Sequence, residues 1–194
     1  MLEAVLVRKN VTAKTKITVK SLVSVGLIIC AVGLPQLVHL IGGAPGGVQW
    51  LPMYLPVLIA GCILGTYWGL GVGIMSPVVS FLLTAAIGDP MPALARLPFM
   101  IAELAVFAAV SGLFTKKIGE NMWMAFPAVL IAAVSGRAFF ILLVALFQSV
   151  SSLSVAVVWG QIQTGLLGLI LQAVIVPFII MGLSLLLNKD KKAE

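Results

Sequence analysis

Three charged residues interrupt otherwise apolar stretches of this chain: Arg96, Glu103 and Arg137. A charge inside a bilayer is costly, and such residues usually face a water-filled cavity, a ligand or an opposite charge. Arg96 and Glu103 are seven residues apart, so both would lie on one face of a helix. A guanidinium can bind a carboxylate through two hydrogen bonds. The two arginines therefore predict a site for a small anionic ligand. The alternative is an Arg137–Glu103 pair that only joins two helices.

Further polar and aromatic residues are expected at the same depth, in the outer half of the membrane. This layer contains Trp50, Tyr54, Phe99, Phe140, Trp159 and Gln163, with Gln161 and Thr164 beside the last. With the arginines and Glu103 they form the predicted substrate site, although aromatic residues also occur as an ordinary interfacial belt. His39 is predicted to be an interfacial cap and not a ligand contact. Asp89 is near enough in sequence to neutralise Arg96.

The composition places the chain in the membrane. It is 61% hydrophobic and 9% charged, with a mean hydropathy of +1.20. So little polar surface cannot cover a soluble core, and the sequence indicates an all-α, multi-pass membrane protein. The net charge of +6 comes from basic residues that flank apolar spans, which argues against nucleic-acid binding. Cys30 and Cys62 lie inside spans and are expected to be small buried hydrophobic residues. One histidine and no Cys/His cluster give no reason to expect a metal or cofactor.

The apolar pattern predicts six transmembrane helices in one domain, residues 21–187. Residues 1–20 would form a lead, either lying on the headgroups or frayed, and residues 188–194 a tail. The expected spans are Ser21–Leu40, two spans within Leu51–Ala86, Ala95–Phe114, Trp123–Gln148 and Val155–Leu187. The segment 51–86 is too long for one crossing and is expected to fold back within 65–69.

The connections between spans are marked by glycine, proline and serine. A Gly/Pro loop is expected at 41–47, a turn at 87–92 and a serine-rich loop at 149–154. Gly61, Gly65, Gly69 and Gly73 recur every four residues and are expected to allow close helix contact. The last span is long enough to tilt, to project from the bilayer, or to break at Gly160 or Pro177.

The basic residues predict the topology. Ten of the twelve Lys and Arg residues lie in three groups, within 8–20, at 116–117 and within 189–192. Six spans would put all three groups on one side of the membrane. By the positive-inside rule, that side, with both termini, is cytoplasmic.

Several sequence signatures are missing. There is no GxxxxGK[ST] loop for ATP, no Ser/His/Asp or HExxH arrangement and no detectable inverted repeat. This favours a binding subunit that is not an enzyme and depends on partners for energy. An intramembrane enzyme that uses Glu103 and Arg137 on a lipid-linked substrate is an alternative. The sequence has no second acidic residue at that depth, which argues against this alternative, because acid–base chemistry usually needs a second group. A scaffold without ligand is a third possibility.

Two blocks of sequence carry a family resemblance. They are Leu-Pro-Met-Tyr-Leu-Pro-Val-Leu-Ile-Ala-Gly at 51–61, and Leu-Pro-Phe-Met-Ile-Ala-Glu-Leu at 97–104. With Gly136-Arg137 in the fifth span, they make residues 20–187 resemble the substrate-binding S components of energy-coupling factor (ECF) vitamin transporters, in the branch that includes pantothenate and cobalamin carriers.

The resemblance implies a six-helix subunit in a prokaryotic plasma membrane that captures a vitamin or vitamin precursor from outside. Its partners would be a transmembrane coupling subunit and two ATPases, with lipid around them. Pantothenate is favoured, because it carries a carboxylate for the arginines, and cobalamin is next. Small residues in the first span, commonly Ala-x-x-x-Ala, dock the coupling subunit in this family. Here the corresponding residues are Gly26 and Cys30, which depart from that pattern.

Overall fold

The computed structural model describes residues 2, 6–7, 11–147 and 154–188, and within these ranges the chain forms helices and connections without any strand. The elements are α2 (Ala13–Trp50), α3 (Tyr54–Leu64), α4 (Thr66–Ala86), α5 (Leu97–Leu113), α6 (Thr115–Glu120), the 3-10 turn η1 (Met122–Met124), α7 (Ala125–Phe147) and α8 (Val155–Asn188). Five helical segments of the described chain are long and apolar enough to cross a membrane, and α5 is a shorter apolar helix. The predicted class, an all-α membrane protein, is confirmed. The N-terminal Arg8 and Lys9, the tail from 189 and most of the serine-rich loop fall outside the described residues.

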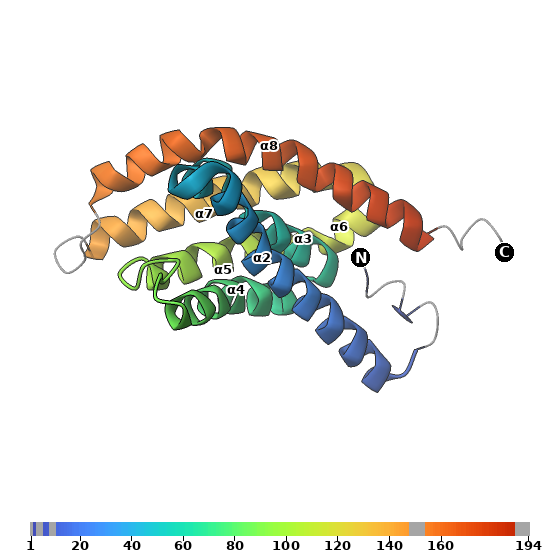
Figure 1. Cartoon of the computed structure of the whole chain (residues 1–194). Helices are drawn as coiled ribbons and strands as arrows, with labels where there is room; N and C mark the ends of the chain where they lie inside the picture. Colours follow the sequence, from blue (N-terminus) through green and yellow to red (C-terminus); the bar gives the residue numbers. More distant parts are fainter. Residues whose placement is uncertain (1, 3–5, 8–10, 148–153, 189–194) are drawn as a thin grey trace.

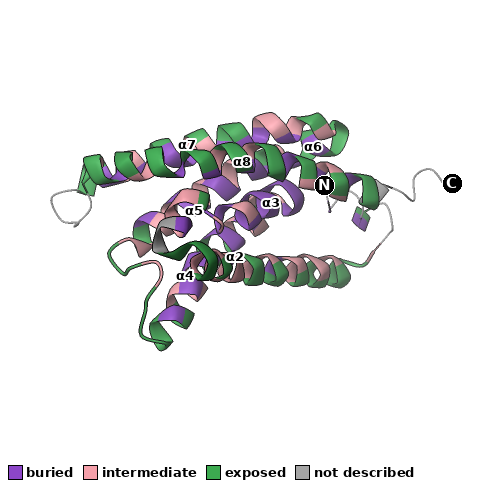
Figure 2. Cartoon of the chain, turned by 45° about the horizontal axis from the view of Figure 1, so that its top comes forward, coloured by how far each residue is buried: buried purple, intermediate pink, exposed green. Residues whose placement is uncertain are grey.

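The helices pack around α3. Helix α5 packs on α3, α4 and α7, while α8 packs on α7 and α2. Nearly every residue of α3 is buried, and it occupies the middle of the bundle in Figure 2. By contrast, only 6% of the most apolar window of α2 is buried. Its N-terminal half extends away from the other helices (Figure 1).

Helix α2 differs from the predicted first span at both ends. It begins at Ala13, where the backbone N–H of Thr15 donates to the hydroxyl of Thr12 at 3.4 Å, so part of the expected lead is helical. The predicted Gly/Pro loop at 41–47 is wrong. The only non-helical residue inside α2 is Gly43, at φ 63°, and the helix resumes to Trp50. One glycine with a positive φ suffices to redirect the chain.

The predicted hairpin in 51–86 is present, with its turn reduced to one residue. Gly65, at φ 89°, separates α3 from α4. A Cβ on Gly69 would lie 2.9 Å from the Cα of Gly61, and one on Gly73 would lie 2.7 Å from the carbonyl oxygen of Leu104. These glycines therefore let α3, α4 and α5 approach closely, as predicted.

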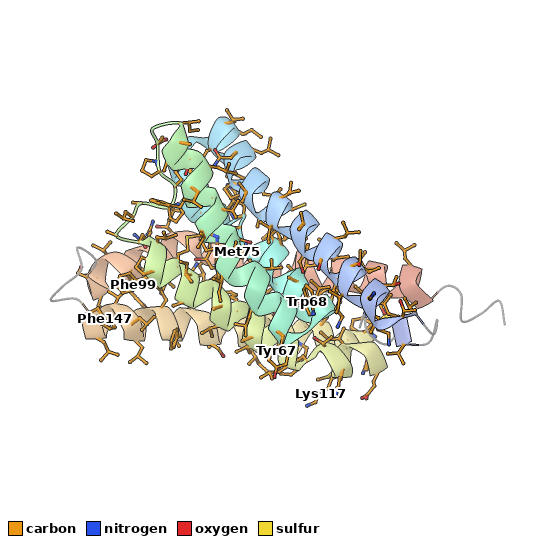
Figure 3. All side chains as sticks on the ribbon, turned by 90° about the horizontal axis from the view of Figure 1, so that it is seen from below. Tyr67, Trp68, Met75, Phe99, Lys117 and Phe147 are labelled. Atoms are coloured by element: carbon orange, nitrogen blue, oxygen red, sulfur yellow. The ribbon has the colours of Figure 1, made fainter. Side chains whose placement is uncertain are left out.

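The ends of the helices divide the molecule into two poles. The start of α2, helix α6 and the end of α8 lie at one end, and the α4–α5 connection lies at the other (Figure 1). Lys117, in α6, lies at the first end, and Phe99, in α5, lies toward the other (Figure 3). Helix α8 runs as one element from Val155 to Asn188 and does not break at Gly160 or Pro177.

Candidate functional site

A cavity of about 360 Å³ opens near the pole that contains the α4–α5 connection. All of the long helices contribute to its wall. From the first half of the chain the lining residues are Pro35, Gln36, His39, Gly47, Val48, Leu51, Pro52, Met53, Tyr54 and Ser80. From the second half they are Asp89, Pro90, Met91, Pro92, Ala93, Arg96, Met100, Glu103, Arg137, Phe140 and Gln161. The wall is thus mostly apolar with a few polar groups, which is the usual composition of a small-molecule site.

Three polar side chains from three helices meet in the wall of this cavity. Nη1 of Arg137 lies 2.8 Å from Oε1 of Glu103. The hydroxyl of Tyr54 donates to Oε2 of Glu103 at 2.6 Å. The Arg137 guanidinium also lies over the Tyr54 ring, 5.0 Å from its centre. Glu103 is 1% exposed and Arg137 is 8% exposed, so the cluster is almost fully removed from solvent. Arg137 and Tyr54 thus contact different oxygens of the Glu103 carboxylate.

Part of the Arg137 guanidinium remains unused. Its Nε and Nη2 atoms are buried and have no hydrogen-bond partner within the described chain. The ion pair therefore engages one nitrogen and leaves two donors at a cavity wall. A buried donor without an acceptor is unfavourable, and such groups usually find a partner in the functional state.

Packing on α3, α5 and α7 fixes the cluster. Tyr54 is the first residue of α3, and its ring packs edge-on against Phe107 with centroids 5.0 Å apart. Gly136 leaves the space that the Phe107 ring fills. The residue after that glycine is Arg137, so the Gly-Arg pair both admits the aromatic ring and places the guanidinium.

The corner before α3 is held from α8. Leu51 adopts the left-handed conformation, with φ 49° and ψ 49°. The side-chain amide of Gln172 donates to the carbonyl oxygens of Trp50 and Leu51, at 3.1 and 2.8 Å. The Trp50 carbonyl lies at the end of α2, where helical partners run out, and the Leu51 carbonyl also accepts from the backbone N–H of Tyr54 at 3.1 Å. Gln172 thereby helps to position Tyr54, which begins α3 directly after this corner.

The mouth of the cavity is held by side chains of α2 and α4. The hydroxyl of Ser80 donates to the Met91 carbonyl at 2.9 Å, and the Met91 N–H donates to the hydroxyl of Thr84 at 2.7 Å. The connection 87–96 is therefore anchored where it lines the cavity. His39 contacts the Gly43 carbonyl through Nδ1 at 3.1 Å. It thus contacts the break in α2 and also lines the cavity, so the interfacial role stays a prediction.

The structure separates the predicted site residues into two groups. Tyr54, Arg96, Glu103, Arg137 and Phe140 line the cavity, and Phe99 packs edge-on behind Phe140 with centroids 6.4 Å apart. The remaining three, Trp50, Trp159 and Gln163, are exposed and lie outside the cavity.

The contrast between the glutamines of α8 has a simple cause. Gln161 points into the cavity, and Gln163 lies two residues on, which turns it about 200° around the helix axis. The sequence indicates how far along α8 a residue lies, but it does not indicate which way its side chain points.

Two glutamines were not predicted. Gln36 of α2 lines the cavity and Gln172 of α8 holds the α2–α3 corner. Each is an amide that interrupts an apolar stretch of its span, and that was the available signal, because a buried amide requires a partner. Cys30 is exposed on α2 and is not the buried residue expected, whereas Cys62 is buried.

The described residues of the cavity wall supply charged, hydrogen-bonding and apolar groups. Within the described ranges no group of three or more His, Cys, Asp or Glu side chains is placed to hold a metal ion. Comparisons of the chain with protein-family models, curated proteins and solved structures give no match. The fold and the site together define a multi-pass, all-α membrane protein with a largely apolar cavity and a buried, partly unpaired guanidinium.

Proposed function

We propose that this chain is the substrate-binding S subunit of an ECF-type transporter, which captures a water-soluble vitamin or vitamin precursor from outside the cell. The observation that carries the proposal is the cavity whose wall contains the Tyr54–Glu103–Arg137 cluster. A pair that served only to join two helices would be expected to use the donors of Arg137 more fully, but two of them have no partner. The sequence blocks around Tyr54 and Glu103 resemble those of S components, and this resemblance is the basis for proposing the family.

The size of the cavity favours pantothenate over cobalamin. A volume of about 360 Å³ is at the small end of the range for small-molecule sites, which is about 300–1,000 Å³. Pantothenate is compact and carries a carboxylate, and cobalamin is several times larger. Arg96 lines the same cavity and adds a positive charge, which Asp89 in the same lining offsets.

The proposal includes six spans, with α5 as the fourth and both termini in the cytoplasm. The cavity then opens to the outside, and the pole with Lys116 and Lys117 faces the cytoplasm. Such an arrangement fits a subunit that collects its ligand outside and receives energy from partners inside.

Helix α2 is the proposed contact with the coupling subunit. Its outer face carries exposed Leu22, Val25 and Ile29, and Gly26 has no atom within 4 Å of where a Cβ would be. Small residues on an exposed apolar face let a second helix approach closely. Gly26 and the exposed Cys30 form such a face.

Co-purification tests the proposal directly. The full tagged chain is extracted from membranes in a mild detergent, and proteins and small molecules released from it are identified by mass spectrometry. We expect a transmembrane subunit, two ATPases and a vitamin. ATP-driven accumulation by the isolated chain in liposomes, or turnover of a lipid-linked substrate, would contradict the proposal.

A matched pair of variants tests the docking face. Gly26→Leu on α2 is expected to reduce recovery of the coupling subunit and leave ligand affinity unchanged. Gly182→Leu on α8 is the control, because a Cβ there also meets no atom within 4 Å. Equal recovery of the coupling subunit with both variants would exclude this part of α2 from the interface.

A further inference from the structure

We infer that Gln36 and Arg137 recognise the two ends of one ligand, which is an elongated small molecule with a carboxylate at one end and a carbonyl or hydroxyl oxygen at the other. The inference rests on the proposed function and specifies the chemistry of its ligand. It also gives Gln36 a role in specificity.

The buried polar atoms of the cavity wall are the starting point. Among the described residues, six buried side-chain nitrogen or oxygen atoms have no hydrogen-bond partner. Four of them belong to residues that line the cavity: Nε2 of Gln36, Nε and Nη2 of Arg137, and Oε1 of Glu103. Oε1 of Glu103 faces Arg137 Nη1 at 2.8 Å and is neutralised there. Three donors of cavity-lining residues are therefore buried without an acceptor, and a ligand that satisfies them must present acceptors.

The geometry of guanidinium selects the first acceptor. The N–H bonds of Nε and Nη2 point the same way from one edge of the planar group. Two parallel donors match the two oxygens of a carboxylate. Glu103 contacts the remaining nitrogen, Nη1. Arg137 can therefore hold Glu103 and a ligand carboxylate at the same time.

Gln36 offers the second contact from a different wall. It belongs to α2, which packs on α3, α4 and α8, while Arg137 belongs to α7, which packs on α5 and α8. A ligand that meets both must therefore reach from a residue of α2 to a residue of α7. A neutral amide N–H suits a carbonyl or hydroxyl oxygen. The lining also includes Met53, Met100 and Phe140, which suit an apolar middle section of such a ligand.

Two probes of nearly equal shape test the carboxylate. Pantothenate and panthenol differ in having a carboxylate or a hydroxymethyl group at one end. Isothermal titration of the full wild-type chain in detergent is expected to give at least about tenfold tighter binding of pantothenate, because a charge-assisted pair is lost with panthenol. Equal binding of the two probes would overturn the carboxylate assignment while leaving capture of a vitamin supported.

Variants then show which residue faces which end. The double variant Arg137→Met with Glu103→Gln is expected to lose the preference for pantothenate, so that the affinity ratio of the two probes approaches one. Gln36→Leu is expected to weaken both probes about fivefold or more and to leave their ratio unchanged, because both probes retain the distant oxygen. Gln36→Glu removes the donors at similar size and should weaken both probes at least as much.

Gln163→Leu is the matched control, because Gln163 is exposed outside the cavity. Unchanged affinities with Gln36→Leu would overturn the role of Gln36. A change in the probe ratio with Gln36→Leu would overturn the assignment of the two ends. If the wild-type chain binds neither probe, the inferred ligand class fails, while co-purification with the coupling subunit and ATPases still tests the proposed function separately.

Discussion

Arg137 and Glu103 form an ion pair that uses one of the three guanidinium nitrogens, with Nη1 2.8 Å from Oε1 and both side chains buried. The helices that carry them, α7 and α5, pack directly on each other. The pair thus contributes to the bundle and also leaves donors at the cavity wall.

The first prediction separates these two contributions. Arg137→Met alone leaves the Glu103 carboxylate buried without its cation, and we expect a loss of about 3–5 kcal/mol in the free energy of unfolding. Adding Glu103→Gln removes the buried charge and should restore most of that stability. Thermal unfolding in detergent measures this, with Lys117→Met at the opposite pole as control. If the restored double variant binds pantothenate as the wild-type chain does, the pair only joins two helices.

The second prediction concerns the hydroxyl of Tyr54. Tyr54→Phe keeps the ring against Phe107 and Arg137 but removes the 2.6 Å hydrogen bond to Glu103. A hydrogen bond to a charged group is worth about 1.5–3 kcal/mol, so the unfolding temperature should fall. Tyr67→Phe is the control, because Tyr67 is 89% exposed. Equal unfolding temperatures for the two variants would show that the Tyr54 bond contributes nothing.

The third prediction compares two glycines of α4. A Cβ on Gly73 would lie 2.7 Å from the Leu104 carbonyl oxygen, whereas one on Gly71 meets nothing within 4 Å. Gly73→Ala should therefore push α5 away and destabilise the protein by about 1–3 kcal/mol. Gly71→Ala should be neutral or slightly stabilising, because alanine favours a helix by about 0.8–1.0 kcal/mol over glycine. Size-exclusion chromatography and thermal unfolding report both.

The fourth prediction concerns the corner between α2 and α3. Gln172→Leu removes both donors to the Trp50 and Leu51 carbonyls. We expect a loss of about 1–3 kcal/mol in stability, because the carbonyls lose a buried partner. Gln163→Leu, the same substitution at an exposed position of α8, is the control. A normal unfolding temperature for Gln172→Leu would mean that the Leu51 corner holds without this side chain.

The fifth prediction concerns orientation in the membrane. In a background with Cys30→Ser and Cys62→Ala, Ile87→Cys and Lys117→Cys place single thiols at opposite poles, both at exposed positions. A membrane-impermeant thiol reagent added to intact cells should label only Ile87→Cys. Labelling of Lys117→Cys alone would reverse the topology, and labelling of both would mean that the poles do not face opposite sides.

Two features of the fold follow from sequence because they depend on chain length and local backbone chemistry. A 36-residue apolar segment cannot cross a bilayer of about 30 Å once, so a turn in 51–86 was required. Gly65 has the positive φ that other residues adopt only at a cost. Likewise, Arg137 and Glu103 were expected at one depth, and a buried charge needs an opposite charge beside it.

Other features depend on how the helices rotate and pack. Sequence depth put Gln163 and Trp159 in the site, but the packing of α8 turns Gln161 inward and leaves those two exposed. The composition of the 41–47 segment is typical of a loop, yet the segment is helical except at one residue, Gly43. Local chemistry cannot fix these outcomes, because helix rotation is decided by contacts between residues far apart in the chain.

The cavity itself combines both kinds of information. The sequence by itself indicated that a carboxylate and a guanidinium lie at one depth within apolar spans, where an unpaired charge is costly. Only the tertiary structure decided that Tyr54 would hold the other carboxylate oxygen, that two donors of Arg137 would remain unused, and that Gln36 would line the same cavity. These depend on the spacing of packed helices, and that spacing is set by glycines and rings such as Gly136 and Phe107.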